Sequence, residues 1–458
     1  MISNPEINWR ESSLQTDQDI VECLFNTLGR PVGYGENAMG GYDPNGDSHL
    51  VIITKDGDVS VEQQIADAIA SDDHNWIVFD KDDFASASEI GLYRLGCTDA
   101  DMLANLGTTD VNLCLNYRDW CGANNVGESD CLQEFFNVRL NDKDLSFRNP
   151  LVGSNTTVDG RGAKPVFLFS GFSLGSADGE DPTATAVSVI MTHLMFQGAG
   201  HDEDHGLDPD MIRSTGASHD IWIHKNMFDT TGDSAFDVKV GAYNITVSFN
   251  LLRNVKRAAL HGSSDSREIN AQITTTIHNN AFITTDDYYS YFGDGARRVP
   301  LARRGASHMF NNVFYGYRKD ILSVRVGARI LFEDNAFLNV STNPEDDDIE
   351  YLVENLLRDF QEGGLEIKGS RVWLSNSSCV VDDAASGDLT ASHGSTPDMM
   401  ADYSVASQNV ITSNRQSAGQ ALVDYVLATA GPAGALPFNS SLASSQDSII
   451  AQPRRACQ

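Results

Sequence analysis

Four aspartates in the middle of the chain have spacings that suit a cation site. Asp208 and Asp210 are two residues apart, and Asp233 and Asp237 are four residues apart. On a β-strand these separations place the members of each pair on one face. If the two segments stack as parallel strands about 4.8 Å apart, four carboxylates meet on one exposed sheet, where they repel unless a hard cation such as Ca²⁺ binds. A single aspartate is more often a solvated surface residue, so the interpretation depends on the group.

Basic residues follow the aspartates in a chain that is otherwise acidic. They are Lys256 and Arg257 and, in the run ARRVPLARRG from Ala296, Arg297, Arg298, Arg303 and Arg304. A positive surface beside a cation site would recognise a polyanion with regularly spaced carboxylates. The alternative is that these side chains form ion pairs with nearby acids, which is the more frequent role of exposed arginines.

The charge balance limits the partners of the chain. Lys and Arg number 32 against 64 Asp and Glu, which gives a formal net charge of −32 over 458 residues. Such a chain repels nucleic acid and anionic membrane surfaces, so we expect neither as a partner. No stretch reaches the roughly 18 apolar residues of a membrane span.

The cysteines predict an oxidising compartment. Four of the seven lie between Cys97 and Cys131, a density typical of secreted proteins, and at least two disulfides are expected there. The spacing does not decide their connectivity, does not suit zinc, and leaves at least one thiol free or paired between molecules. Residues 1–22 contain no apolar run preceded by basic residues, so a secretory signal, if one existed, has been removed.

Repeated segments predict the elements that position these residues. IWIHKNMF, ITVSFNLL, ITTTIHNNAF, HMFNNVF and ILFEDNAF each end a β-type run in Asn-x-Phe or Asn-x-Leu at intervals of about 23 to 32 residues. The corresponding asparagines are Asn226, Asn250, Asn280, Asn312 and Asn335. This repeated pattern favours an all-β fold, a parallel β-helix, with a β-sandwich as the alternative. The asparagines are expected to adopt the left-handed region and stack their amides, while Ile223, Val247, Ile277 and Phe310 point inward in successive coils.

The repeats also divide the chain. Residues 146–385 are predicted to form the coil, 1–145 an N-terminal flank and cap, and 386–458 a C-terminal arm and cap of one elongated domain. Amphipathic helices are expected from Ser60 and from Pro344, and an extended surface arm from Gly431. Long loops join the strands, and the aromatic run Tyr288–Phe292 is a candidate for stacking on sugar rings.

Several ordered motifs resemble the pectate lyases of polysaccharide lyase family one. They are LDPDMIRSTGASHDIWIHKN, DSAFDVKVGAYNITVSFNLLRNVKRAALHGSSDS, RRVPLARRG and LSVRVGARILFEDNAF, between about Asn155 and Asn339. Members of this family fold as right-handed parallel β-helices, so the resemblance implies that this chain has the same fold and that helices cap its ends. It also implies that the chain is secreted and acts as a monomer.

Carried over position by position, the resemblance assigns roles to individual residues. Asp208, Asp210, Asp233 and Asp237 would bind Ca²⁺, Arg298 would be the Brønsted base, and Arg303 and Arg325 would hold substrate carboxylates. Arg257 stands where the family usually has lysine and is assigned to catalysis beside Arg298, whereas Lys256 is assigned to substrate binding. The segment Trp222–Lys225 lacks an aspartate that the family has there.

The activity that the resemblance implies is calcium-dependent, endo-type cleavage of α-1,4-linked polygalacturonate by β-elimination, giving 4,5-unsaturated oligogalacturonides. The sequence leaves three alternative functions. A pectin hydrolase would use paired acids such as Asp382 and Asp383 with His261, but these occur in the wrong order. A pectin lyase would tend to lack the acidic site, and a non-catalytic polysaccharide-binding β-helix would not need Arg298.

Overall fold

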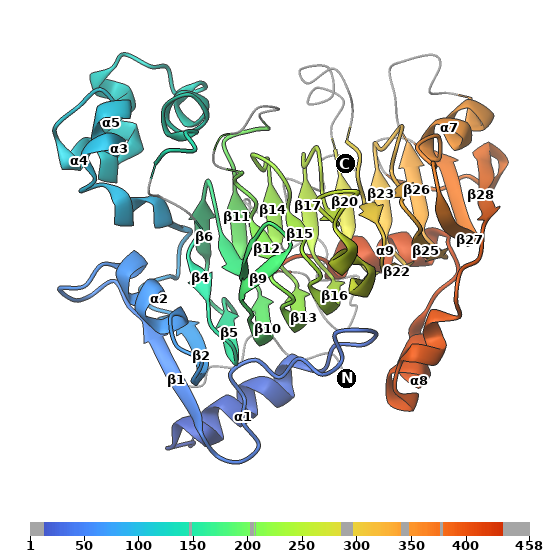
Figure 1. The fold of residues 1–458 in the computed structure, drawn as a ribbon, viewed down its shortest axis with the longest axis horizontal. Coiled ribbons are helices and arrows are strands. Elements are labelled where there is room, and N and C mark those ends of the chain that lie inside the picture. Colours follow the sequence, from blue (N-terminus) through green and yellow to red (C-terminus); the bar gives the residue numbers. More distant parts are fainter. Residues whose placement is uncertain are drawn as a thin grey trace.

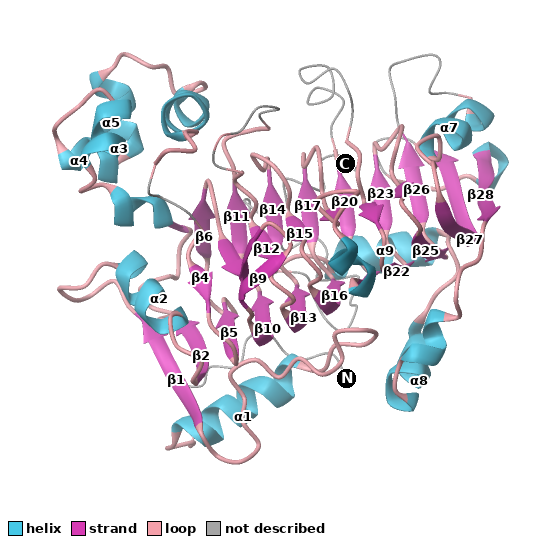
Figure 2. Cartoon of the chain, in the orientation of Figure 1, coloured by secondary structure: helices cyan, strands magenta, loops and turns pink. Residues whose placement is uncertain are grey.

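The computed structural model describes residues 13–145, 149–201, 206, 208–284, 296–339, 348–375 and 379–433. The chain winds into a coil, and the strands of successive turns stack in parallel to form three sheets along it. These sheets are here called wall one, wall two and wall three (Figures 1 and 2). Successive turns pass through wall three, wall one and wall two in that order. The predicted parallel β-helix is confirmed, and the β-sandwich alternative is wrong because neighbouring strands of each wall are parallel.

The walls are given in stacking order. Wall one contains β1 (Ser48–Ile53), β2 (His74–Phe79), β5 (Thr156–Asp159), β10 (Val187–Thr192), β13 (His219–His224), β16 (Tyr243–Ser248), β19 (Thr274–His278), β22 (Ala306–Phe310), β25 (Ala328–Glu333) and β27 (Gly363–Leu374). Wall two contains β3 (Ser88–Ile90), β6 (Pro165–Leu168), β11 (Met195–Gln197), β14 (Met227–Asp229), β17 (Leu251–Arg253), β20 (Ala281–Ile283), β23 (Val313–Tyr315) and β26 (Ala336–Asn339). Wall three contains β4 (Leu151–Val152), β7 (Phe172–Leu174), β12 (Ile212–Ser214), β15 (Phe236–Val238), β18 (Leu260–His261), β21 (Leu301–Arg303) and β24 (Ser323–Arg325).

Strands outside these stacks close the ends and edges. The long strand β27 pairs with β25 in wall one and then with β26 in wall two, which joins the two walls into one 19-stranded sheet. Strand β28 (Ser386–His393) pairs antiparallel with β27 and ends the coil. The hairpin of β8 (Ser176–Asp178) and β9 (Asp181–Ala184) projects from the coil as a separate two-stranded sheet.

The repeated asparagines form a ladder at the bend between walls one and two. In every asparagine of the ladder after Asn226, the side-chain oxygen accepts from the backbone N–H and the amide group of the asparagine one coil earlier, as Asn280 does from Asn250 at 2.8 and 2.9 Å. All five are fully buried. Amide stacking is thus confirmed, but the left-handed backbone falls on the residue before each asparagine, for example Asn279 with φ 54°.

Inward-pointing side chains fill the coil in register. Ile223 pairs with Val247, Val247 with Ile277, and Ile277 with Met309, all fully buried. The inward position predicted for Phe310 is wrong, because that residue pairs with His278 and stacks on its ring outside the coil. The phenylalanines of the Asn-x-Phe motifs stack along wall two, as Phe314 does on Phe337 with ring centroids 4.4 Å apart.

Flanking segments cover the coil and extend it. Strands β1 to β3 lie within residues 1–145, so the parallel coil begins before residue 146. The helix expected from Ser60 is α2, capped by that serine, and the helix expected from Pro344 begins after its cap Asp348 as α7. The predicted arm from Gly431 lies mostly outside the described residues. The helices are α1 (Asp17–Leu28), α2 (Val61–Ile69), η2 (Leu92–Gly96), α3 (Ala100–Asn105), α4 (Val111–Leu115), α5 (Tyr117–Ala123), η3 (Gln133–Leu140), η4 (Glu268–Gln272), α7 (Ile349–Leu356), η6 (Asp383–Ala385), η7 (Met399–Asp402), α8 (Val405–Asn414) and α9 (Gln420–Thr429).

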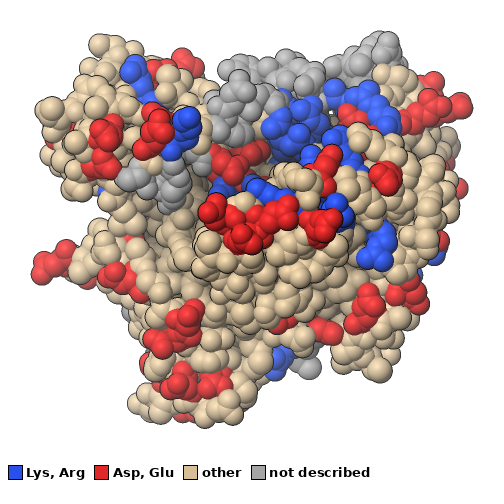
Figure 3. Space-filling view, viewed as in Figure 1, with Lys and Arg blue, Asp and Glu red and all other residues tan. Residues whose placement is uncertain are grey.

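Charge is unevenly distributed over the face that Figure 3 presents. Lys and Arg gather in the upper right of this view, over the region where Figure 1 draws strands β17 to β26, and Asp and Glu lie along their lower border. Within the described residues no helix has the length and apolarity of a membrane span.

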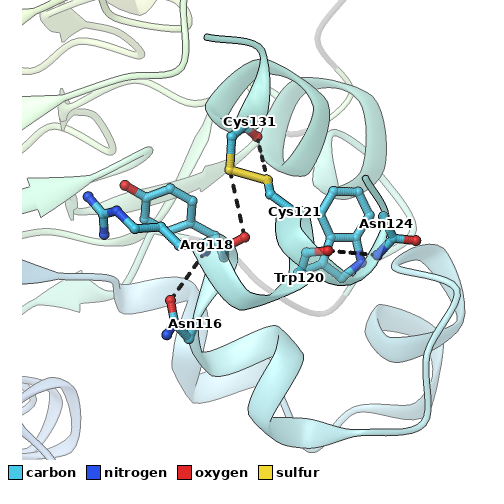
Figure 4. The surroundings of a disulfide bond; sticks show 7 residues. Asn116, Arg118, Trp120, Cys121, Asn124 and Cys131 are labelled. Atoms are coloured by element: carbon cyan, nitrogen blue, oxygen red, sulfur yellow. Dashed lines mark hydrogen bonds between the residues drawn. A yellow bond between two sulfur atoms is a disulfide. The ribbon is translucent and has the colours of Figure 1, made fainter. Parts of the chain in front are cut away.

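Disulfides hold the helical segment that follows β3. Cys97 bonds to Cys114 and Cys121 to Cys131, and Figure 4 shows the second bridge beside the buried Trp120. This confirms the expected pair of bridges and supplies the connectivity that the spacing left open. Cys379 is also disulfide-bonded, and Cys23 is a free thiol, as the odd number of cysteines suggested.

Candidate functional site

The predicted site residues lie along wall three and the loops that enter it. Asp208 and Asp210 precede β12, Asp233 precedes β15, and Asp237 lies within β15. Because β12 and β15 are paired in parallel, with Arg213 opposite Asp237, the two aspartate pairs meet on neighbouring coils as expected. Wall three is therefore the element that assembles the cluster.

The acidic cluster has the donor chemistry of a hard-cation site. Asp208, Asp210 and Asp233 each offer one carboxylate oxygen, and these oxygens lie within 4.8 Å of one another. Asp237 is not in this group of three. Asp237 is buried and accepts a hydrogen bond from the Leu260 backbone at 2.8 Å. An all-carboxylate set of this compactness fits Ca²⁺ better than a transition metal.

Two basic side chains that sequence reasoning missed complete the cluster. Lys239 Nζ lies 2.8 Å from Asp237 Oδ2 and 2.9 Å from Asp210 Oδ2. Arg213 donates to Asp210 Oδ2 at 3.0 Å and to Asp208 Oδ2 at 2.8 Å. A sequence signal existed, because Lys239 is two residues after Asp237 and therefore shares its strand face.

Burial and mutual repulsion dominate the electrostatics of the cluster. Burial, followed by the charge of Asp237, raises the pKa of Asp210 to about 7. Burial and the charges of Asp210, Asp237 and Asp208 raise the pKa of Asp233 to about 9. The same carboxylates raise the pKa of Lys239 despite its burial. A bound cation would remove the cause of the repulsion, so the residues present fit a metal site.

The predicted base follows on the next coils of wall three. Arg257 and Arg297 form a parallel bridge, which places this pair of segments side by side. Arg298 is partly buried, and its backbone N–H donates to the Asp320 carbonyl at 3.2 Å. Burial and the nearby charges of Arg297 and Arg303 lower the pKa of Arg298, while Asp233 and Asp237 oppose that shift. The Arg298 carbonyl accepts from the backbone N–H of Ala259 at 3.0 Å, and the next residue, Leu260, donates to Asp237, so the backbone of Arg298 lies close to the acidic cluster.

The predicted substrate-binding residues differ in their surroundings. Arg303 and Arg325 are register neighbours in β21 and β24. Arg303 is paired with the exposed Asp265 at 2.5 Å, and Arg325 with Asp359 at 2.8 Å. Lys256 is only 4% exposed, so little of it can reach a ligand. The aromatic run Tyr288–Phe292 lies outside the described residues.

The acids of the hydrolase alternative do not assemble with His261. Asp382 caps the short helix η6, and Asp383 accepts from the Trp373 indole in β27. His261 belongs to β18 in wall three, where burial lowers its pKa to about 4 and keeps it neutral. Asp382 and Asp383 therefore do not form such an acid and base pair with His261.

Comparisons with known proteins point to one family. A family model described as pectate lyase matches residues 151–408, more than half of the chain. Pectate lyase B of Dickeya chrysanthemi is 34% identical over 198 residues, 40% of this chain and 49% of that protein. The pectate trisaccharide-lyase of Bacillus licheniformis is 31% identical over 193 residues, 41% of this chain and 49% of that protein. The chain thus spans about half the length of the curated relatives it matches.

A solved structure supports the fold. The pectate lyase of Acidovorax avenae subsp. citrulli superposes with a TM-score of 0.53 at 14% identity, covering 88% of this chain and 94% of the other. At this identity the likeness concerns the architecture alone. It agrees with the three parallel walls that position the cluster.

Proposed function

Since the chain belongs to the pectate lyase family, we propose that it is a calcium-dependent, endo-acting pectate lyase that cleaves polygalacturonate by β-elimination. The observation that supports this most is the juxtaposition, on wall three, of the carboxylate cluster and Arg298. The acidic charge of the whole chain makes the local basic residues the natural contact for an anionic polymer. The disulfides support a secreted protein, and we propose that it acts as a monomer.

The proposed chemistry begins with a proton that is weakly acidic. The C5 hydrogen of a galacturonate lies next to the carboxylate, and bound Ca²⁺ would supply the positive charge that stabilises the electrons left behind. Asp208, Asp210, Asp233 and Asp237 would hold the ion, while Arg303 and Arg325 would orient neighbouring uronate carboxylates. Arg257 keeps the charge of the usual lysine near the reacting residue but offers a planar guanidinium.

Arg298 would take the C5 proton on a guanidine nitrogen. The electron pair of the broken C5–H bond forms the C4–C5 double bond, and the C4–O bond breaks towards the leaving sugar. The leaving oxygen then gains a proton, so that no water is consumed. The lowered pKa of Arg298 is the property that a base of this type needs.

A substitution in the cluster tests the proposed function. Asp237→Ala should reduce activity on polygalacturonate by at least about a hundredfold, because it removes a buried carboxylate beside the proposed ion. Circular dichroism should still show a β-rich fold. Asp47→Ala, at an exposed carboxylate away from wall three, is the matched control and should retain activity. An Asp237→Ala enzyme as active as the control would refute the assignment.

Binding without catalysis is the second candidate, because a basic surface and an acidic cluster could also retain polysaccharide. The lowered pKa of Arg298 disfavours this candidate, since a protein that only binds polysaccharide does not need an arginine that gives up its proton more easily. A pectin lyase for methylated pectin is disfavoured by the acidic cluster, which a neutral ester does not require.

A further inference from the structure

Lys239 provides a fixed positive charge inside the acidic cluster. Its ammonium group contacts three carboxylates, at 2.8 Å from Asp237, 2.9 Å from Asp210 and 3.3 Å from Asp208. The side chain is 12% exposed, so carboxylate oxygens replace most of its water. The backbone of β15 determines this position, because Lys239 directly follows the strand that carries Asp237.

Arg213 adds a second fixed charge from β12. Its guanidinium contacts Asp210 and Asp208, each also contacted by Lys239. Once all four carboxylates are ionised, as binding of a divalent cation by the cluster requires, these two cations leave two negative charges. That remainder matches one divalent ion.

We propose that Lys239 is a resident counter-ion that limits the free cluster to a single, weakly held divalent cation. The inference rests on the proposed calcium-dependent function. It adds that Lys239 sets the affinity of the acidic cluster for Ca²⁺ and the number of ions that the cluster binds. Ca²⁺ binds carboxylate oxygens at about 2.3–2.6 Å. An ion held by Asp208 and Asp210 would therefore share these two carboxylate groups with the ammonium group, and two cations on the same carboxylates repel each other. Lys239 is a positioning residue in this account and does not contact the substrate.

A purely structural role for Lys239 predicts the opposite result. If the ammonium group only held Asp210 and Asp237 in place, its removal would loosen the carboxylates and weaken cation binding. If it competes with the cation, its removal strengthens binding. The sign of the change therefore separates the two roles.

Calorimetric titration of chelator-treated protein with CaCl₂, without substrate, makes the measurement. Lys239→Gln keeps a hydrogen-bond donor and removes the charge, and it should bind Ca²⁺ at least about tenfold more tightly than the wild type or take up a second ion. Relief of about 1.4 kcal/mol of repulsion already gives a factor of ten. Lys239→Arg retains the charge and should stay within about threefold of the wild type.

Two further variants keep the result interpretable. Lys368→Met removes an exposed lysine that pairs with Glu366 in β27 and should leave Ca²⁺ binding unchanged. Lys239→Met should show the same increase as Lys239→Gln, so either folded variant decides the question. Unchanged, weaker or absent binding in the folded charge-removing variants would overturn the inference. Lyase activity is a separate readout: an inactive protein that shows the predicted calcium response would refute only the proposed function.

Discussion

Arg298 is the residue on which the proposed chemistry depends most. It has a left-handed backbone, with φ 59°, and its carbonyl accepts from Ala259 at 3.0 Å, so wall three fixes the start of its side chain. Burial and two neighbouring arginines lower its pKa. These features suit a proton acceptor better than a residue that only binds the substrate, because binding an anionic substrate would benefit from a stable positive charge.

Replacement of Arg298 by lysine distinguishes a base from an anchor. Lysine keeps a positive charge but changes reach, donor geometry and proton affinity. Arg298→Lys should lower kcat by at least about a hundredfold with a nearly unchanged KM, whereas Arg303→Lys should mainly raise KM. Steady-state kinetics at saturating Ca²⁺ give both constants. If Arg298→Lys retains normal kcat, another residue takes the proton.

The same assignment predicts how the rate depends on pH. A base is active when it is deprotonated, so kcat of the wild type should rise as pH increases towards the lowered pKa of Arg298. Below that pKa each pH unit should change the rate about tenfold. A kcat that is level from neutral to strongly alkaline pH would contradict Arg298 as the titrating base.

For individual residues, the sequence predicted the clustered aspartates better than the basic residues that contact them. The repeat length predicted correctly that Asp208, Asp210 and Asp233 lie close together, but these residues precede β12 and β15 and do not lie on the strand faces that their spacing indicated. The contacts of Arg213 and Lys239 depend on the pairing of β12 with β15 and on side-chain reach, and neither can be read from spacing. The same limit applies to Lys256, whose burial also cannot be read from spacing.

The asparagine ladder is the element that ties successive coils together. The side-chain oxygen of Asn280 accepts two hydrogen bonds from Asn250, whereas that of Asn226, at the end of the ladder, accepts one from Leu194. Asn280→Ala should therefore cost about 2–6 kcal/mol and Asn226→Ala about 1–3 kcal/mol, because each orphaned buried donor costs about 1–3 kcal/mol. Urea denaturation measures both free energies. Equal losses would show that the ladder position is unimportant.

A buried ion pair fixes helix α1 to the first coils. Arg161 contacts Asp159 of β5 at 2.6 Å and also donates to the Leu24 carbonyl of α1 at 2.8 Å. Both side chains are at most 4% exposed. Asp159→Asn leaves the guanidinium without its counter-charge and should cost about 3–5 kcal/mol in the free energy of unfolding.

The exposed pair of Arg139 and Glu134 provides the control for that loss. Its side chains are 43% and 31% exposed, so Glu134→Gln should cost less than about 1 kcal/mol. Urea denaturation of the two variants compares a buried pair with an exposed one. A small loss in Asp159→Asn would mean that α1 is held by apolar packing alone.

The sequence repeat predicts most of the inward-pointing residues of the coil but not all of its strands. Each inward residue stands three positions before its asparagine, as Ile277 does before Asn280, and this rule gives Met309 before Asn312. The expectation for Phe310 departed from that rule, and a shift of one residue reverses the face of a strand. Strands β1 to β3 have no Asn-x-Phe motif, so the repeat could not reveal that they belong to the coil.

At the scale of the whole molecule, function follows from how the coil arranges charge. Parallel stacking places the acidic cluster on early coils of wall three and the arginines on the following coils. An anionic polymer lying along this wall would meet the cation site and the basic side chains in succession. The loops and the disulfide-bonded helical segment have no repeat, so their arrangement could not be predicted from periodicity.

The most direct test of the central claim is the ultraviolet absorbance of products formed from polygalacturonate by the wild-type protein. With Ca²⁺ present, the unsaturated ends created by elimination should make absorbance rise steadily. A chelator should abolish the rise, and excess Ca²⁺ should restore it. Full activity in chelator-treated protein, or new reducing ends without ultraviolet absorbance, would contradict calcium-dependent elimination.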